Sequence, residues 1–156
     1  MKRRRFLSNT LAVGATGIAI SSGFVSPSLV FAAEESNTNP FAAKTLDDVL
    51  KMLNAVEAKP STDVQIKAPE IAENGAVVPL TVSSSMAGVT GISIVVANNP
   101  TPLAATFTLP EGTKAEVSTR IKMAKTSEVL ALVQTKEGLF SAKQEIKVTI
   151  GGCGGY

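Results

Sequence analysis

The sequence predicts a mainly β protein: an immunoglobulin-like antiparallel β-sandwich of about seven strands, with one N-terminal helix and a flexible glycine-rich C-terminal arm. Two observations favour the sandwich. After Pro60, apolar and polar residues alternate with a period of two, which is typical of strands with one buried face. Turn-forming residues interrupt this alternation at short intervals, as they do between the strands of sandwiches. The arm is predicted because four of the last six residues are glycines.

Residues 1–32 have the layout of an export signal. The basic residues Lys2 to Arg5 precede an apolar stretch over about 11–20, and the small residues up to Ala32 suit cleavage. The run Arg3-Arg4-Arg5-Phe6-Leu7 fits the twin-arginine pattern, so we expect a twin-arginine signal peptide, cleavage after Ala32 and a periplasmic location. The apolar stretch is too short for a stable transmembrane helix. A membrane anchor and a basic tail for nucleic acid are the alternative interpretations.

A single helix is predicted over about 46–57. Thr45-Leu46-Asp47-Asp48 has the pattern of a capping box, in which an acidic residue follows a threonine three positions later. Pro60 is expected to end the helix. Its apolar stripe predicts packing against a core or a partner and not a cofactor site, and it consists of residues at helical spacing: Leu46, Val49, Leu50, Leu53 and Val56.

Three strands are predicted in the first half of the β region, over 64–71, 76–83 and 89–97. Glu73-Asn74-Gly75 is a hairpin signal between the first two. In the third strand, apolar residues at 92, 94 and 96 alternate with residues at 93, 95 and 97. Asn98-Asn99-Pro100 closes this strand as a turn.

Four more strands are predicted over 104–109, 116–124, 128–134 and 139–150. The second has Val117, Thr119, Ile121 and Met123 on one face, and Ser118, Arg120 and Lys122 on the other. Residues 128–134 are nearly all apolar, so we expect both faces of that strand to be buried. These elements make one domain, residues 33–150, and residues 151–156 follow it as the arm.

The composition excludes several kinds of site. The chain of 156 residues has one cysteine and no histidine. It therefore cannot form an internal disulfide, a cysteine-rich zinc site or a Cys-His nucleophile pair, and we expect no metal and no cofactor. The formal net charge is +2, and it becomes −2 without residues 1–32, which hold four basic and no acidic residues. Because no basic face is evident, a nucleic-acid partner is not expected.

The only thiol lies in the arm. Cys153 stands between two pairs of glycines, which are Gly151, Gly152, Gly154 and Gly155. Glycine loses the most conformational entropy on ordering, so these residues are expected to form a mobile tail with an exposed thiol. Six extended residues span at most about 20 Å, at roughly 3.3–3.6 Å each. Such a tail could carry its thiol into a narrow pocket of another protein.

Cys153 has three other interpretations: an incidental residue, a disulfide cross-link between two copies, and a prenylation signal. An unused exposed thiol in an oxidising compartment invites unwanted pairing. Prenylation requires aliphatic residues after the cysteine, and glycines follow here. No second cysteine or adjacent cation would lower the pKa of this thiol, so activation is expected from a partner's active site. A chain that supplies a tethered thiol and leaves the chemistry to other enzymes would be a carrier.

Residues 149–155, Thr-Ile-Gly-Gly-Cys-Gly-Gly, resemble the C-terminal motif of the SoxY family, the sulfur-carrying subunits of the periplasmic thiosulfate-oxidation (Sox) system. Residues 73–79, 117–121 and 147–148 are also similar to that family, as is the twin-arginine start, so the resemblance covers essentially the whole chain. It implies that Cys153 carries thiosulfonate and persulfide intermediates covalently, and that the chain is a carrier and not an enzyme.

The resemblance also implies partners. SoxZ, a small β-sandwich subunit, would form a heterodimer with this chain, and the folded pair would be exported together. The c-type cytochrome SoxAX would join thiosulfate to Cys153, and the hydrolase SoxB would release sulfate. The molybdenum enzyme SoxCD would oxidise the remaining persulfide in organisms that have it.

Several residues permit more than one interpretation. Tyr156 departs from the family motif, which typically ends at the second Gly-Gly pair. Arg120 is expected either to pair with an acid on a partner or to be a solvated strand residue. The four glycines of the arm are expected to be needed for entry into partner channels. Two rival functions remain, namely a thiol-dependent enzyme (a single-cysteine peroxidase or a sulfur transferase) and a disulfide-linked adaptor.

Overall fold

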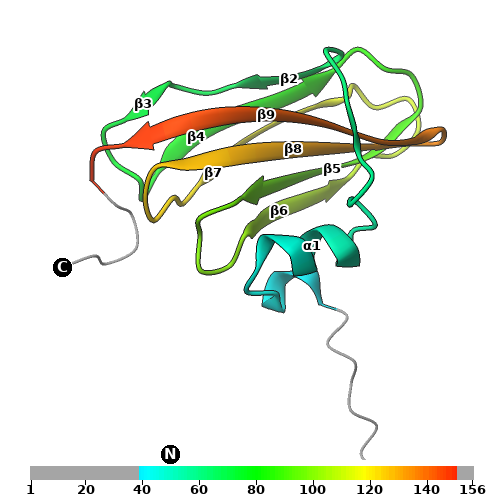
Figure 1. Ribbon diagram of the computed structural model, residues 1–156. Coiled ribbons are helices and arrows are strands. Elements are labelled where there is room, and N and C mark those ends of the chain that lie inside the picture. The colour runs from blue at the N-terminus through cyan, green and yellow to red at the C-terminus, as the bar shows by residue number, and fades with distance from the viewer. Residues whose placement is uncertain (1–38, 151–156) are drawn as a thin grey trace, which may run out of the picture. The chain divides into compact units, whose positions relative to one another are not determined.

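The computed structural model describes residues 39–150. The predicted signal peptide at 1–32 and the arm at 151–156, with Cys153 and its four glycines, lie outside the described residues. The predicted immunoglobulin-like β-sandwich is confirmed, because two sheets with mainly antiparallel strands enclose an apolar core (Figure 1). No helix in the described part of the chain is long and apolar enough to cross a membrane.

The two sheets differ in size. The larger has the spatial order β1 (Lys59–Pro60), β9 (Gly138–Val148), β8 (Ser127–Thr135), β5 (Val89–Val96) and β6 (Leu103–Thr108), and β3 (Ile71–Ala72) also pairs with β9. The smaller has the order β2 (Val64–Lys67), β4 (Val78–Ser84) and β7 (Glu116–Ile121). Only β1 and β3 run parallel to their partner; the other described pairs are antiparallel.

The prediction of one continuous strand over 64–71 is wrong, because the segment is divided between two strands. Its first half is β2, which pairs with β4 as expected, with Val64 opposite Ser84. Pro69 has no N–H to donate to a ladder, and beyond it the chain crosses to the other sheet, where β3 pairs with β9. Asn74-Gly75 therefore turns between β3 and β4 and does not close a hairpin. With β1, which was not predicted, the described chain has nine strands where seven were expected.

The core between the sheets follows the predicted alternation. Ile92, Ile94 and Val96 of β5 are at most 1% exposed and face β4, whose residues Leu80 and Val82 are also buried. Removing each such side chain from water contributes about 1.5–3 kcal/mol. The core therefore holds the smaller sheet against the larger one.

Strand β8 is buried on both faces, as predicted. Val129, Ala131 and Val133 belong to the core between the sheets. Leu130 and Leu132 belong to a second apolar cluster on the opposite face of the larger sheet. The helical segment covers this cluster (Figure 1), so the domain has three layers.

The helical segment consists of a short 3-10 turn, η1 (Pro40–Ala42), and the helix α1 (Leu46–Met52). The predicted N-cap is confirmed, since the Thr45 hydroxyl accepts a hydrogen bond from the Asp48 N–H at 3.2 Å. The same hydroxyl donates to the Asp48 carboxylate at 2.6 Å. Val49 is fully buried and anchors the helix in the second cluster.

The helix ends five residues earlier than predicted, because Asn54 stops it before Pro60. Asn54 has a φ of 53°, in the left-handed region that asparagine tolerates. Its N–H donates to the Lys51 carbonyl at 3.0 Å, and the Ala55 N–H donates to the Leu50 carbonyl at 2.6 Å. These two bonds satisfy the last turn of the helix in a Schellman motif. Ala55 is only 3% exposed, so the motif also turns the chain onto the sheet.

Asn54 gives a test of this helix end. Asn54→Ala should lower the free energy of unfolding by about 1 kcal/mol, because the left-handed conformation costs an ordinary residue roughly 1–2 kcal/mol and alanine lacks the short polar side chain that lets asparagine tolerate it. Asn54→Gly is the matched control and should not lower it, because glycine adopts this conformation freely. Urea unfolding measures both variants. Equal losses would contradict a left-handed cap at Asn54.

Candidate functional site at the root of the C-terminal segment

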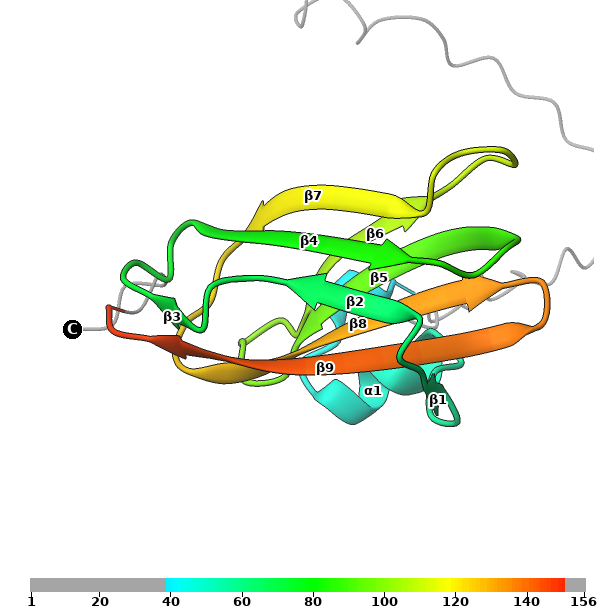
Figure 2. The ribbon, with the colours of Figure 1, turned by 90° about the horizontal axis from the view of Figure 1, so that it is seen from above.

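Cys153 and its glycines lie outside the described residues, so the described part of the site is the root from which they extend. Figure 2 shows the end of β9 beside β3, where the chain leaves the domain. Strand β9 was predicted to reach Ile150 but ends at Val148. Thr149 and Ile150 are instead held by loop contacts. We call residues 147–150 the root.

Backbone bonds fix the root to residues 70–75. The Lys147 N–H donates to the Glu70 carbonyl at 2.9 Å, and the Thr149 N–H donates to the Ala72 carbonyl at 3.1 Å. The Thr149 hydroxyl donates to the Glu73 carbonyl at 2.9 Å. Beyond the end of the sheet ladder, the chain is therefore still held for two more residues.

The turn at Asn74 and Gly75 closes the root. Gly75 is buried, and its N–H donates to the Ile150 carbonyl at 2.8 Å. Its carbonyl accepts from the Met123 N–H at 2.7 Å. The Asn74 side chain accepts from the Ala76 N–H at 2.8 Å, which is an Asx turn. One buried residue, Gly75, thus joins the root to the segment after β7.

The connection between β7 and β8 is fixed from the other side. The Asn99 side chain donates to the Lys122 carbonyl at 2.7 Å and accepts from the Ala124 N–H at 2.9 Å. The Thr126 hydroxyl accepts from the Val148 N–H at 3.0 Å. The turn predicted at Asn98-Asn99-Pro100 therefore also clamps the loop that borders the root, which the sequence did not reveal.

Cations gather near the root. Between Glu116 and Glu128 the chain carries Arg120, Lys122 and Lys125 and no acidic residue. Arg120 and Lys122 are exposed, as the predicted polar face of β7 requires, whereas Ile121 and Met123 on the opposite face are buried. None of the ion pairs found among the described residues involves these three cations.

The length of the chain after Ile150 limits where the thiol can act. Cys153 is three residues beyond Ile150, so its Cα lies within about 10–11 Å of the Ile150 Cα, at 3.3–3.6 Å per residue. Any group that reacts with Cys153 must come to this end of the sandwich. Three large apolar side chains in the segments at this end are exposed: Ile71, Val77 and Ile150.

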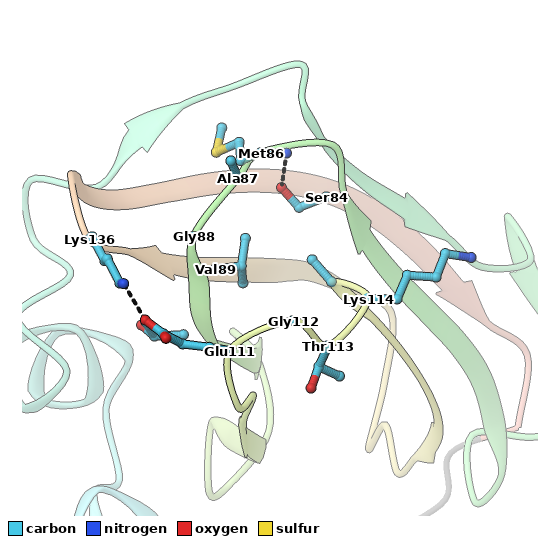
Figure 3. Close-up of a pocket in the computed structure, with 12 residues that line it drawn as sticks. Ser84, Met86, Ala87, Gly88, Val89, Glu111, Gly112, Thr113, Lys114 and Lys136 are labelled. Carbon is cyan, nitrogen blue, oxygen red and sulfur yellow. Dashed lines mark hydrogen bonds and ion pairs between the residues drawn. The ribbon is translucent and has the colours of Figure 1, made fainter.

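Another cavity lies at the other end of the sandwich. Figure 3 shows it, with a volume of about 460 Å³, between the end of β4, the β6–β7 connection and Lys136. Lys136 there forms an ion pair with Glu111. Strand β9 runs the length of the larger sheet between this end and the root, about 35 Å for 11 residues. A thiol on the C-terminal segment cannot reach this cavity.

No group of three or more metal-ligating side chains occurs within residues 39–150. The sequence predicts only a turn at Asn74 and Gly75. Their function as a clamp on the root depends on contacts with Ile150 and Met123, which are distant in the sequence.

Comparison with known proteins places these features in a family. The family model for the sulfur oxidation protein SoxY matches residues 50–153. A solved structure of the sulfur carrier protein SoxY from Chlorobium limicola f thiosulfatophilum is 46% identical, with a TM-score of 0.61 over 70% of this chain and 99% of that chain. A superoxide reductase (neelaredoxin) from Ignicoccus hospitalis is 21% identical, with a TM-score of 0.50 over 55% and 79% of the two chains, and is similar in fold alone. No curated protein matches the chain.

The clamp on the root can be tested at Asn74. Asn74→Ala removes the Asx hydrogen bond, worth about 0.5–1.5 kcal/mol, and should accelerate amide exchange at Gly75 by up to about tenfold. Asn39→Ala is the matched control, because the Asn39 side chain makes the same kind of bond to the Phe41 N–H at the helical segment. It should leave Gly75 exchange unchanged. Unaltered exchange in Asn74→Ala would show that the turn does not need its side chain.

Proposed function

The chain belongs to the SoxY family of sulfur-oxidation carrier proteins, and on this premise we propose that it holds the intermediates of thiosulfate oxidation covalently on Cys153. The observation that carries the proposal is the position of the chain's only thiol. It lies three residues beyond a root fixed by backbone hydrogen bonds, and the family match extends to this residue. The rest of the described domain serves to hold that root.

The loading step is an oxidation. The Cys153 thiol and thiosulfate give Cys153–S–S–SO₃⁻, one proton and two electrons. A sulfur–sulfur bond forms, and a c-type cytochrome partner of the SoxAX kind accepts the electrons. The chain supplies the sulfur atom of its thiol, and the partner supplies the oxidant.

The next step is a hydrolysis. Water attacks the sulfonate sulfur of Cys153–S–S–SO₃⁻, which leaves the persulfide Cys153–S–SH and releases hydrogen sulfate. We assign this step to a hydrolase of the SoxB kind. A molybdenum enzyme of the SoxCD kind then oxidises the persulfide in organisms that have one.

The short reach of Cys153 restricts how these partners approach. Each must bring its reacting atoms within about 10–11 Å of Ile150, plus the length of the adduct. Each therefore covers the end of the sandwich that carries the root. The exposed side chains of Ile71, Val77 and Ile150 are the apolar surface available there. A firmly held root lowers the entropy lost when the thiol is positioned.

We propose that the working unit is a heterodimer with SoxZ in the periplasm. Residues 1–32 direct export by the twin-arginine route, which carries folded proteins. A folded pair could then cross together although only one chain has the signal. The four glycines around Cys153 serve entry of the thiol into partner channels.

Covalent loading of Cys153 can be tested by the mass of the intact chain. Incubation of the full mature chain with thiosulfate and the cytochrome partner should add one S₂O₃ unit to Cys153, measured by intact-mass spectrometry. Cys153→Ser should gain nothing. Turnover of thiosulfate by the isolated chain without a partner would support the thiol-enzyme alternative. Loss of dimerisation as the sole effect of Cys153→Ser would support a disulfide-linked adaptor.

The glycines give a second prediction. Gly152→Val adds a β-branched side chain next to the thiol and should slow loading by roughly tenfold or more while the fold is retained, because misplacement of the reacting atom is costly. Thr113→Val is the control: it places a valine on the β6–β7 connection, at the far end of the sandwich, and so reports any effect of the apolar side chain away from the thiol. Loading kinetics equal to those of the unaltered chain in both variants would refute the requirement for glycine.

A further inference from the structure

A second cavity lies beside the root. It occupies about 450 Å³ between the β5–β6 connection and the end of β7. Strands β6 and β7 are edge strands of the two sheets, and they contact each other here. Asn99 and Thr101 line one side of the cavity, and Arg120 and Lys122 line the other. We call this cavity the edge cleft.

The edge cleft is cationic. Its lining includes two positively charged side chains and no carboxylate. The cavity at the far end differs, because its Lys136 is paired with Glu111 and Lys114 with Glu116. An arginine guanidinium presents a planar fork of donors that suits two oxygens of one oxoanion, and a neighbouring ammonium adds a third donor. The edge cleft therefore has the chemistry of an oxoanion site.

The edge cleft also lies within reach of the thiol. Two hydrogen bonds through Gly75 connect the Ile150 carbonyl to the Met123 N–H, and Met123 follows Lys122 directly. Chain segments joined by backbone hydrogen bonds lie about 4.7–4.9 Å apart, so two such steps from Ile150 to Met123 amount to about 10 Å. The Cα of Cys153 can travel about 10–11 Å from Ile150, and an adduct on its sulfur extends further. The anionic end of the adduct can thus reach the edge cleft.

We propose that the edge cleft binds the sulfonate end of the thiosulfonate on Cys153, with Arg120 and Lys122 as the donors. This inference rests on the proposed carrier function. The free thiol and the persulfide have no sulfonate oxygens, so the edge cleft recognises the loaded arm and not the other states. After one partner has loaded Cys153 and before the next partner acts, the sulfonate end would stay bound in the edge cleft of the same chain.

Chemical loading tests this without any partner enzyme. Tetrathionate reacts with the Cys153 thiolate, which forms Cys153–S–S–SO₃⁻ and expels thiosulfate. Amide chemical shifts of the loaded mature chain are then compared with those of the free chain. We expect shifts at Arg120, Lys122 and Thr101. In the double variant Arg120→Gln/Lys122→Gln, the chemical-shift change at Thr101 should be lost.

Two controls define the outcome. Lys114→Gln/Lys136→Gln removes two cations at the far cavity and should leave the Thr101 shift intact. Loading with iodoacetamide gives a neutral adduct and should not produce the shift. Equal shifts with both adducts, no shift with tetrathionate, or retention of the shift in Arg120→Gln/Lys122→Gln would each overturn the proposal. The single variants Arg120→Gln and Lys122→Gln serve if the double variant does not fold.

A binding measurement separates this proposal from the carrier function. Thiosulfate is titrated into Cys153→Ser at constant ionic strength set with chloride. The dissociation constant should rise at least tenfold on adding Arg120→Gln/Lys122→Gln, and not on adding Lys114→Gln/Lys136→Gln. If the cytochrome fails to load Cys153 but the chemical adduct still binds, the proposed function fails and the anion site stands. If loading proceeds but neither probe binds at Arg120 and Lys122, the anion site alone fails.

Discussion

Burial of β8 on both faces is the constraint from which the rest of the domain follows. Val129 and Val133 point into the space between the sheets, and Leu130 and Leu132 point away from it. Each face must be covered, so the three-stranded sheet packs on one side and α1 on the other. Strand β9 pairs with β8 along nearly its whole length and is held in place by it. The root is the end of β9, and its fixed position therefore derives from the core.

Much of the fold could be predicted from the sequence, because alternation and capping are local signals. Thr45 marked the start of the helix, and the apolar run at 128–134 marked a strand covered twice. Non-local choices were missed. The pattern at 64–71 fits one strand, but Pro69 and the free edge of β9 divide it between two sheets. For the candidate site, the cysteine was evident in the sequence, whereas the bonds from Gly75 to Ile150 and Met123 join residues far apart in the chain.

The two ends of the sandwich differ in how their cations are paired. At the far end, cations and carboxylates neutralise each other in pairs, as Lys136 does with Glu111. At the root end, β7 carries Arg120 and Lys122 on an edge strand without such partners among the described residues. Cations without an ion-pair partner therefore stand on the strand that lines the edge cleft, although residues 33–156 together carry a formal net charge of −2. Net charge alone would have suggested the opposite.

The two shortest strands have a further consequence, for solubility. Strand β9 would present an outer edge of 11 residues to solvent, and long free edges recruit strands from other molecules. β1 covers this edge at Phe140 and Ser141, and β3 covers it at Lys147 and Val148. The uncovered middle carries Lys143 and Glu145, whose charges discourage edge-to-edge addition. Protection from aggregation is thus built into the same strand that extends towards the thiol.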